Sequence, residues 1–87
     1  MKKIKKRDFK YFCKEIQKDI KLFNVNLILK NDKAAEVYDI EFTGLRKAFR
    51  TLFNCYSKTV HNNNGEIEKV IFVENGTGKL IKVIKAM

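Results

Sequence analysis

Residues 7–42 read RDFKYFCKEIQKDIKLFNVNLILKNDKAAEVYDIEF, and the spacing of their hydrophobic side chains changes partway along. In residues 7–23 hydrophobic side chains recur every three or four positions, which is typical of one buried helix face. These side chains are Phe9, Phe12, Ile16, Ile20 and Phe23. Residues 25–30 and 35–42 are instead rich in strand-forming side chains and flank a turn at residues 31–33. A helix followed by a β-hairpin is therefore predicted.

The second half of the chain repeats this order. Thr43 is a suitable N-cap for a helix that runs to about residue 58. Its buried side would carry Leu45, Ala48, Phe49, Leu52 and Tyr56. A polar loop over residues 58–65 and a final hairpin with its turn at residues 75–78 complete the chain. In the first hairpin we expect Tyr38, Ile40 and Phe42 to share one strand face.

The register of the final hairpin follows from charge pairing. With Glu74 opposite Lys79, the cross-strand pairs would be Phe72 with Ile81, Val70 with Val83 and Glu68 with Lys85. The other face of this hairpin would carry Lys69, Ile67 and five further residues that form a candidate interface. This face is too hydrophobic to be left fully in water. That candidate interface is Ile71, Val73, Leu80, Lys82 and Ile84. We expect it to be covered by the basic N-terminal arm or to contact a partner, including a second copy of the chain.

The fold class predicted is α+β, with the order α-ββ-α-ββ in one domain over residues 1–87. The simplest way for both hairpins to bury one face is a four-stranded antiparallel sheet with both helices packed on one side. A chain of 87 residues can build only one hydrophobic core.

The composition is strongly basic. Lys and Arg number 19 against 10 Asp and Glu, a formal net charge of +9. This charge suits nucleic acid or an acidic protein surface and excludes an acidic mimic of DNA. The alternative is a basic protein whose charge only keeps it dissolved.

The sequence also bears on location. No apolar stretch is long enough to cross a membrane. Cys13 and Cys55 both have helical apolar spacing, which suits reduced, buried thiols in the cytoplasm. A phage or plasmid origin is suggested by the abundance of Lys and Asn.

The positive charge of the first helix is gathered on one flank. At 100° per residue, Asp8, Glu15 and Asp19 lie on the opposite flank. Basic side chains at a spacing of four repel one another by about 0.2–0.5 kcal/mol per pair, a cost that an anionic partner would remove. The basic flank consists of Arg7, Lys10, Lys14, Lys18 and Lys21, with Lys3 in line if the helix begins earlier.

The second helix carries Arg46, Lys47 and Arg50 near its start, where the helix dipole disfavours cations. A bound phosphate would reverse this effect. Ordinary solvent-exposed charge is the alternative.

Residues for chemistry are few. His61 is the single histidine and has no ligand-spaced Cys, Asp or Glu beside it, so neither a metal nor another cofactor is expected. Residues 76–79 read GTGK, but Leu80 stands where a nucleotide-binding loop has Ser or Thr, and a strand follows. We therefore expect no enzyme activity.

Three functions remain open. The first is a non-enzymatic nucleic-acid-binding protein that contacts phosphates through the basic helix side chains. Tyr11, at the edge of the basic flank, would stack on a base if the ligand is single-stranded. The second is a phage- or plasmid-encoded inhibitor or adaptor, similar in role to an anti-CRISPR protein, that docks on a host nucleoprotein enzyme. The third is a ribosome-dependent nuclease toxin.

Overall fold

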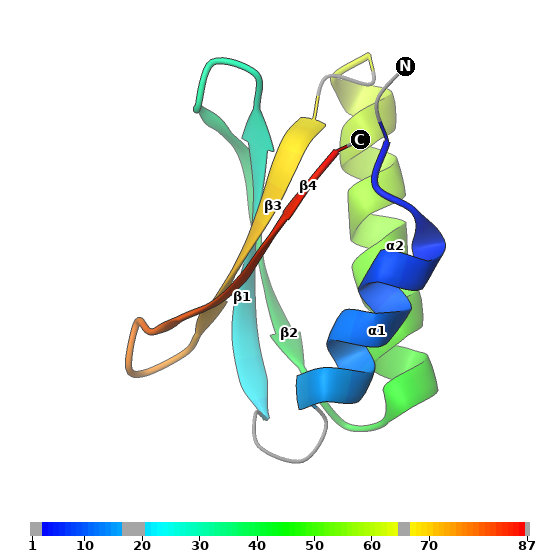
Figure 1. The fold of residues 1–87 in the computed structure, drawn as a ribbon, viewed down its shortest axis with the longest axis vertical. Helices are drawn as coiled ribbons and strands as arrows, with labels where there is room; N and C mark the ends of the chain where they lie inside the picture. Colours follow the sequence, from blue (N-terminus) through cyan, green and yellow to red (C-terminus); the bar gives the residue numbers. More distant parts are fainter. Residues whose placement is uncertain (1–2, 17–20, 65–66, 87) are drawn as a thin grey trace.

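A computed structural model describes residues 3–16, 21–64 and 67–86. Its elements follow the order α1 (Lys6–Ile16), β1 (Leu22–Leu29), β2 (Ala34–Glu41), α2 (Leu45–Asn62), β3 (Ile67–Glu74) and β4 (Leu80–Lys85). The strands form one antiparallel sheet in the order β2-β1-β3-β4. Both helices pack on the same face of this sheet (Figure 1). The predicted α+β fold is confirmed.

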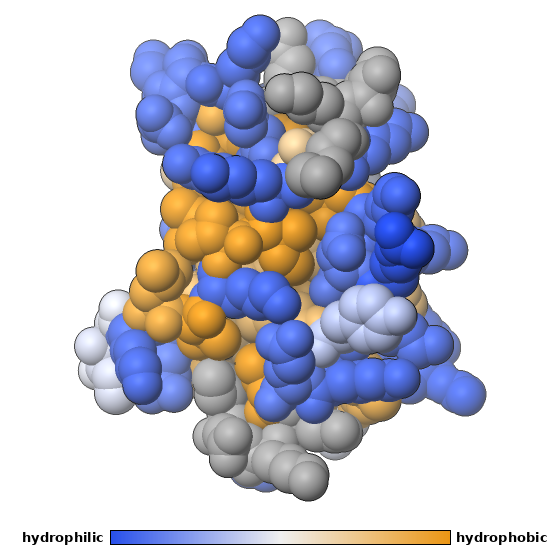
Figure 2. All heavy atoms as spheres, in the orientation of Figure 1, coloured by the Kyte–Doolittle hydropathy of each residue, from blue (hydrophilic) through white to orange (hydrophobic). Residues whose placement is uncertain are grey.

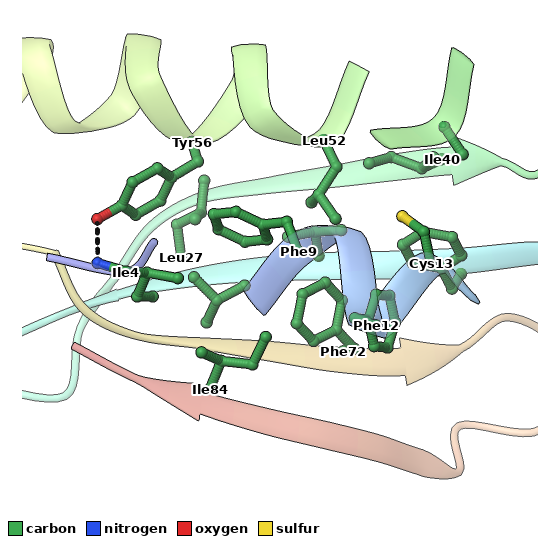
Figure 3. Packing of buried hydrophobic residues seen from close by; sticks show 14 of the residues in the cluster. Ile4, Phe9, Phe12, Cys13, Leu27, Ile40, Leu52, Tyr56, Phe72 and Ile84 are labelled. Atoms are coloured by element: carbon green, nitrogen blue, oxygen red, sulfur yellow. Dashed lines mark hydrogen bonds between the residues drawn. The ribbon is translucent and has the colours of Figure 1, made fainter. Parts of the chain in front are cut away.

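The core lies between the helices and the sheet, and every element contributes to it. At its centre the ring of Phe12 on α1 stacks on Phe72 of β3, with ring centroids 3.8 Å apart (Figure 3). Phe23 of β1 meets Phe12 edge-on at 5.5 Å. Aromatic contacts of this kind add about 0.5–1.5 kcal/mol per pair to the hydrophobic burial. These contacts fix α1 over the middle of the sheet.

The first predicted helix is wrong at its C-terminal end. Helix α1 ends at Ile16 in the described residues, and β1 has begun by Leu22, so Phe23 belongs to a strand. Phe23 is buried together with Val25 and Leu27, which follow at a spacing of two. Phe23 therefore satisfies a helical spacing counted from α1 and a strand spacing counted from β1. Ile20 lies outside the described residues.

The limits of α2 also differ from the prediction. Gly44, not Thr43, is the N-cap, and no side chain caps the helix start. The helix continues to Asn62, so that His61 stands in the last helical turn instead of in a loop. Within the described part of the chain, neither helix is both long and apolar enough to cross a membrane.

The final hairpin starts in the predicted register and then leaves it. Across the turn the Glu74 N–H donates to the Lys79 carbonyl at 2.8 Å, and Val73 pairs with Leu80. A β-bulge follows, in which β4 contains one residue more than β3. The pairs predicted beyond the bulge are therefore wrong by one residue. The observed pairs are Phe72 with Lys82, Val70 with Ile84 and Lys69 with Lys85.

The bulge changes which β4 side chains enter the core. Ile84 is buried against the core in place of Val83, and the additional methylene contributes about 0.8 kcal/mol of hydrophobic burial. Lys82 turns to the helix side, where its Nζ lies 3.3 Å from Oε1 of Glu15. The candidate interface is therefore wrong for Ile84 and Lys82, and Ile67 is in the core as well.

The shifted register sets two lysines opposite each other. Lys69 and Lys85 are cross-strand partners, an arrangement that destabilises an antiparallel pair. The carboxylate of Asp32, in the turn between β1 and β2, lies 3.2 Å from Nζ of Lys69. This ion pair offsets part of the repulsion between the two lysines.

Candidate nucleic-acid interface

Helix α1 presents different charges to its two neighbours. Its acidic side chains Asp8 and Glu15 line a groove beside β4. Its basic side chains Lys6 and Lys10 lie on the side of α2, because Lys6 stands over the ring of Phe53 and Lys10 lines a hollow with residues of α2. The packing of α1 on the sheet thus directs its negative flank to the sheet edge and its positive flank to α2.

Aromatic rings form the base of the contact between the helices. Phe53 of α2 is half-buried and meets Phe9 of α1 with ring centroids 6.1 Å apart. Phe49, one turn earlier, stacks on Phe53 at 6.1 Å and an interplanar angle of 17°. Nζ of Lys6 lies 5.0 Å from the centroid of Phe53, within the range of a cation–π interaction. Rings and cations therefore alternate along this contact.

Two hollows open along the same contact. The first, of about 320 Å³, is lined by Lys10, Leu45, Arg46 and Phe49. The second, of about 370 Å³, is lined by residues of the N-terminal arm (residues 3–5, before α1), of α1 and of the second half of α2. Those residues are Lys3, Ile4, Lys6, Phe53, Tyr56, Ser57, Val60 and His61. We call this surface the helix seam and define it by Lys3, Lys6, Lys10, Arg46, Phe49 and Phe53.

The cations of the helix seam have no carboxylate beside them among the described residues. Neither hollow is lined by Asp or Glu, and α2 contains no acidic residue along its length. The ion pairs found in the described residues lie elsewhere, at Lys69 with Asp32 and at Lys82 with Glu15. Strand β2, at the far edge of the sheet, instead carries three acidic residues and no basic one. The helix seam and strand β2 therefore carry charge of opposite sign.

The start of α2 adds to the positive potential. Its first turn holds Arg46 and Lys47 and no acidic residue, and Gly44 offers no side chain to cap the free N–H groups. Each cation in this position costs about 0.3–1 kcal/mol through the helix dipole. An anion held by Arg46 beside the first hollow would reverse the sign of that cost.

The structure brings together some of the predicted binding residues and separates others. Lys3, Lys10 and Arg46 line the hollows of the helix seam. Four others are exposed on the two helices without lining either hollow, namely Arg7, Lys14, Lys47 and Arg50. Lys21 is exposed but lies just before β1, so it is not part of α1. Lys18 lies outside the described residues.

Sequence reasoning missed Lys6, His61 and Phe53. Lys6 belongs to the series with Lys10 and Lys14 at a spacing of four, and a helix start placed one residue earlier would have included it. His61 was assigned to a loop because polar residues surround it. Phe53 gave no signal of its own, since only the packing of α1 against α2 leaves its ring half-buried beside a lysine.

The two thiols are free. Burial raises the pKa of the Cys13 thiol to about 11, so it stays protonated at neutral pH. Burial also raises the pKa of Cys55, and the charge of Lys58 partly opposes this effect. A thiol that keeps its proton is a weak nucleophile and a weak metal ligand. In the described residues, no group of three His, Cys, Asp or Glu side chains is arranged to hold a metal ion.

Comparisons of the chain with family models, with curated proteins and with solved structures find no match.

Proposed function

We propose that the protein is a non-enzymatic nucleic-acid-binding protein of the cytoplasm that holds the phosphate backbone at the helix seam. The observation that carries this proposal is the meeting of Lys3, Lys6, Lys10 and Arg46 from three segments of the chain, without a carboxylate among the described residues that line the hollows. Repulsion between these cations is removed when phosphates lie between them, and the released counterions favour binding. The two free thiols fit a reducing compartment.

Phe49 and Phe53 provide flat apolar surface beside the cations. Cations that follow the backbone and rings that receive bases are the two parts of a single-strand-binding surface. Tyr11 is also exposed, but it lines the groove beside β4 with Asp8 and Glu15, so its ring does not extend the helix seam. We therefore expect single-stranded DNA or RNA to bind at least as tightly as duplex DNA.

The test is fluorescence anisotropy with labelled duplex DNA, single-stranded DNA and RNA over a series of salt concentrations. If about six phosphates are neutralised, the slope of log affinity against log salt is about −5 on duplex DNA and about −4 on a single strand. The double variant Lys10→Glu/Arg46→Glu should bind weakly and reduce the magnitude of the slope by about 2.

The matched control is Lys30→Glu/Lys33→Glu. Both lysines are exposed at the turn between β1 and β2, and the change in net charge is the same. Binding by the helix seam leaves this control close to the wild type. Equal losses in the two variants would mean that net charge alone drives binding, and the site would be wrong.

No binding at low salt would reject the function and favour the second candidate, an inhibitor or adaptor that docks on a host nucleoprotein enzyme. Capture of such a partner from lysate would then survive nuclease treatment.

A further inference from the structure

The sheet has one face that no helix covers among the described residues (Figure 1). We call it the outer face. Five large hydrophobic side chains of the described residues are exposed, and strand alternation and the register of the sheet place four of them on the outer face. They are Leu22, Val37, Leu80 and Val83, with exposed fractions between 37% and 56%. Figure 2 shows hydrophobic side chains gathered where β3 and β4 lie.

The register orders the outer face into rows that run across the strands. One row joins Val37, Asn26, Ile71 and Val83, and it crosses the middle of the face. The next row, from Asp39 on β2, reaches Leu80 on β4 through Asn24 and Val73. The middle of the face is therefore mainly hydrophobic, with two asparagines on the central strand β1. Hydrophobic surface of this kind on a small chain marks an interaction surface.

Charge lies at two diagonally opposite corners of the outer face. Asp39 and Glu41 are exposed near the C-terminal end of β2, on one edge of the sheet. Lys69 and Lys85 are partners at the other end of the strands, on β3 and the opposite edge strand β4. Lys69 is already paired with Asp32, so Lys85 is the cation of this corner with no ion pair among the described residues. The outer face thus has an acidic corner and a basic corner.

We propose that the outer face binds a second copy of this chain in a symmetric dimer. The two-fold axis lies in the interface and runs along the diagonal that joins the two remaining corners of the outer face. It therefore sets the acidic corner of each copy against the basic corner of its partner. The strands of the two sheets then cross at a large angle, as in orthogonal sheet packing. The asparagine side chains near the axis have both donors and acceptors, so they can hydrogen bond with each other across it. A face that complements itself in this way fits an isologous contact.

The size of the outer face sets the strength of the dimer. Four strands about 4.8 Å apart and about eight residues long, at about 3.3 Å per residue, give about 500 Å² per copy. The total of about 1,000 Å² lies at the lower end for specific interfaces. We therefore expect a reversible dimer with a dissociation constant in the micromolar range. The two helix seams would point away from each other, on opposite sides of the dimer.

The test is sedimentation velocity of the full chain, treated with nuclease, at concentrations from about 1 to about 500 µM. Wild type should change from monomer to dimer within this range. Lys85→Glu makes both corners acidic, and the double variant Asp39→Lys/Glu41→Lys makes both corners basic, so each variant alone should dimerise at least about tenfold more weakly. An equimolar mixture of the two should form a heterodimer about as readily as wild type, because each corner then meets its opposite.

Recovery in the mixture also shows that both variants are folded. Lys58→Glu, on the exposed side of α2, is the control with the same charge change as Lys85→Glu and should leave dimerisation unchanged. A monomer at every concentration would overturn the proposal and leave the outer face to a different protein. A dimer that neither corner variant weakens, or a mixture that stays monomeric, would show that these corners do not meet. No arm contains nucleic acid, so none of these outcomes bears on binding by the helix seam.

Discussion

Tyr56 ties the N-terminal arm to α2 through one buried hydrogen bond. The backbone N–H of Ile4 donates to the hydroxyl of Tyr56 at 3.1 Å, and both residues are buried (Figure 3). The substitution Tyr56→Phe removes this acceptor and leaves the ring in place against Phe9, whose centroid lies 5.1 Å away. The expected result is a loss of stability together with release of the arm.

The size of the loss follows from two routes. If the arm stays docked, the Ile4 N–H is buried without a partner, which costs about 1–3 kcal/mol. If the arm detaches, that N–H reaches water but the side chain of Ile4 leaves the core, which costs about 1.5–3 kcal/mol. The free energy of unfolding should therefore fall by about 1–3 kcal/mol by either route. For a domain of this size the melting temperature falls by about 4–8 °C for each kcal/mol.

Urea denaturation measures the loss, and amide hydrogen exchange at Ile4 separates the two routes, since a detached arm exchanges fast. Tyr11→Phe is the matched control, because Tyr11 is 57% exposed and its change should stay within about 0.5 kcal/mol. Lys3 and Lys6 flank Ile4 in the helix seam, so a detached arm should also weaken nucleic-acid binding. A Tyr56→Phe variant as stable as the Tyr11→Phe control would refute this account of the arm.

Two further changes test the core. Thr59 is fully buried, and its hydroxyl donates to the Cys55 carbonyl at 2.8 Å and lies 3.1 Å from the Tyr38 hydroxyl. Thr59→Val should lower the free energy of unfolding by about 1–2 kcal/mol, and Thr59→Ser is the control that keeps the hydroxyl. Equal urea midpoints for wild type and Thr59→Val would contradict this prediction. Folding raises the pKa of Cys13 from 9.0 to about 11, so between these pH values the folded state retains a proton that the unfolded state loses. Stability should therefore fall by about 2–3 kcal/mol as the pH rises through this window and stay unaffected by this thiol below it. Cys13→Ala should remove this part of the pH dependence, and parallel curves for the two proteins would contradict the assignment.

The element order could be predicted because each element carries its own periodicity. The residues Phe9, Phe12 and Ile16 repeat at the helical spacing and are all buried in α1. Tyr38 and Ile40 alternate on the helix side of β2 as expected, with Ile40 buried and Tyr38 packed against the core. Local spacing predicts which side of an element is hydrophobic, and burying that side is the main driving force of folding.

Boundaries and register were less predictable because neighbouring elements compete for the same residues. Phe23 fits both α1 and β1 by spacing, and only its position beside Phe72 in the sheet places it in the strand. The bulge in β4 has no local sequence signal. It arises because Ile84 can then enter the core while Lys82 reaches Glu15 on α1, a residue distant in the sequence.

The basic composition, the α+β order and the gathering of lysines on one flank of α1 follow from the sequence by itself, since charge and periodicity are properties of a single segment. Which other segment that flank meets was decided only by the tertiary structure. Helix packing brings Lys10 to Arg46 and Lys6 to Phe53, and sheet register sends Asp39 and Lys85 to opposite corners of the uncovered face. The physical reason is that the helix seam and the outer face each join residues from segments far apart in the chain. The proximity of these residues depends on how the whole core packs rather than on any local pattern.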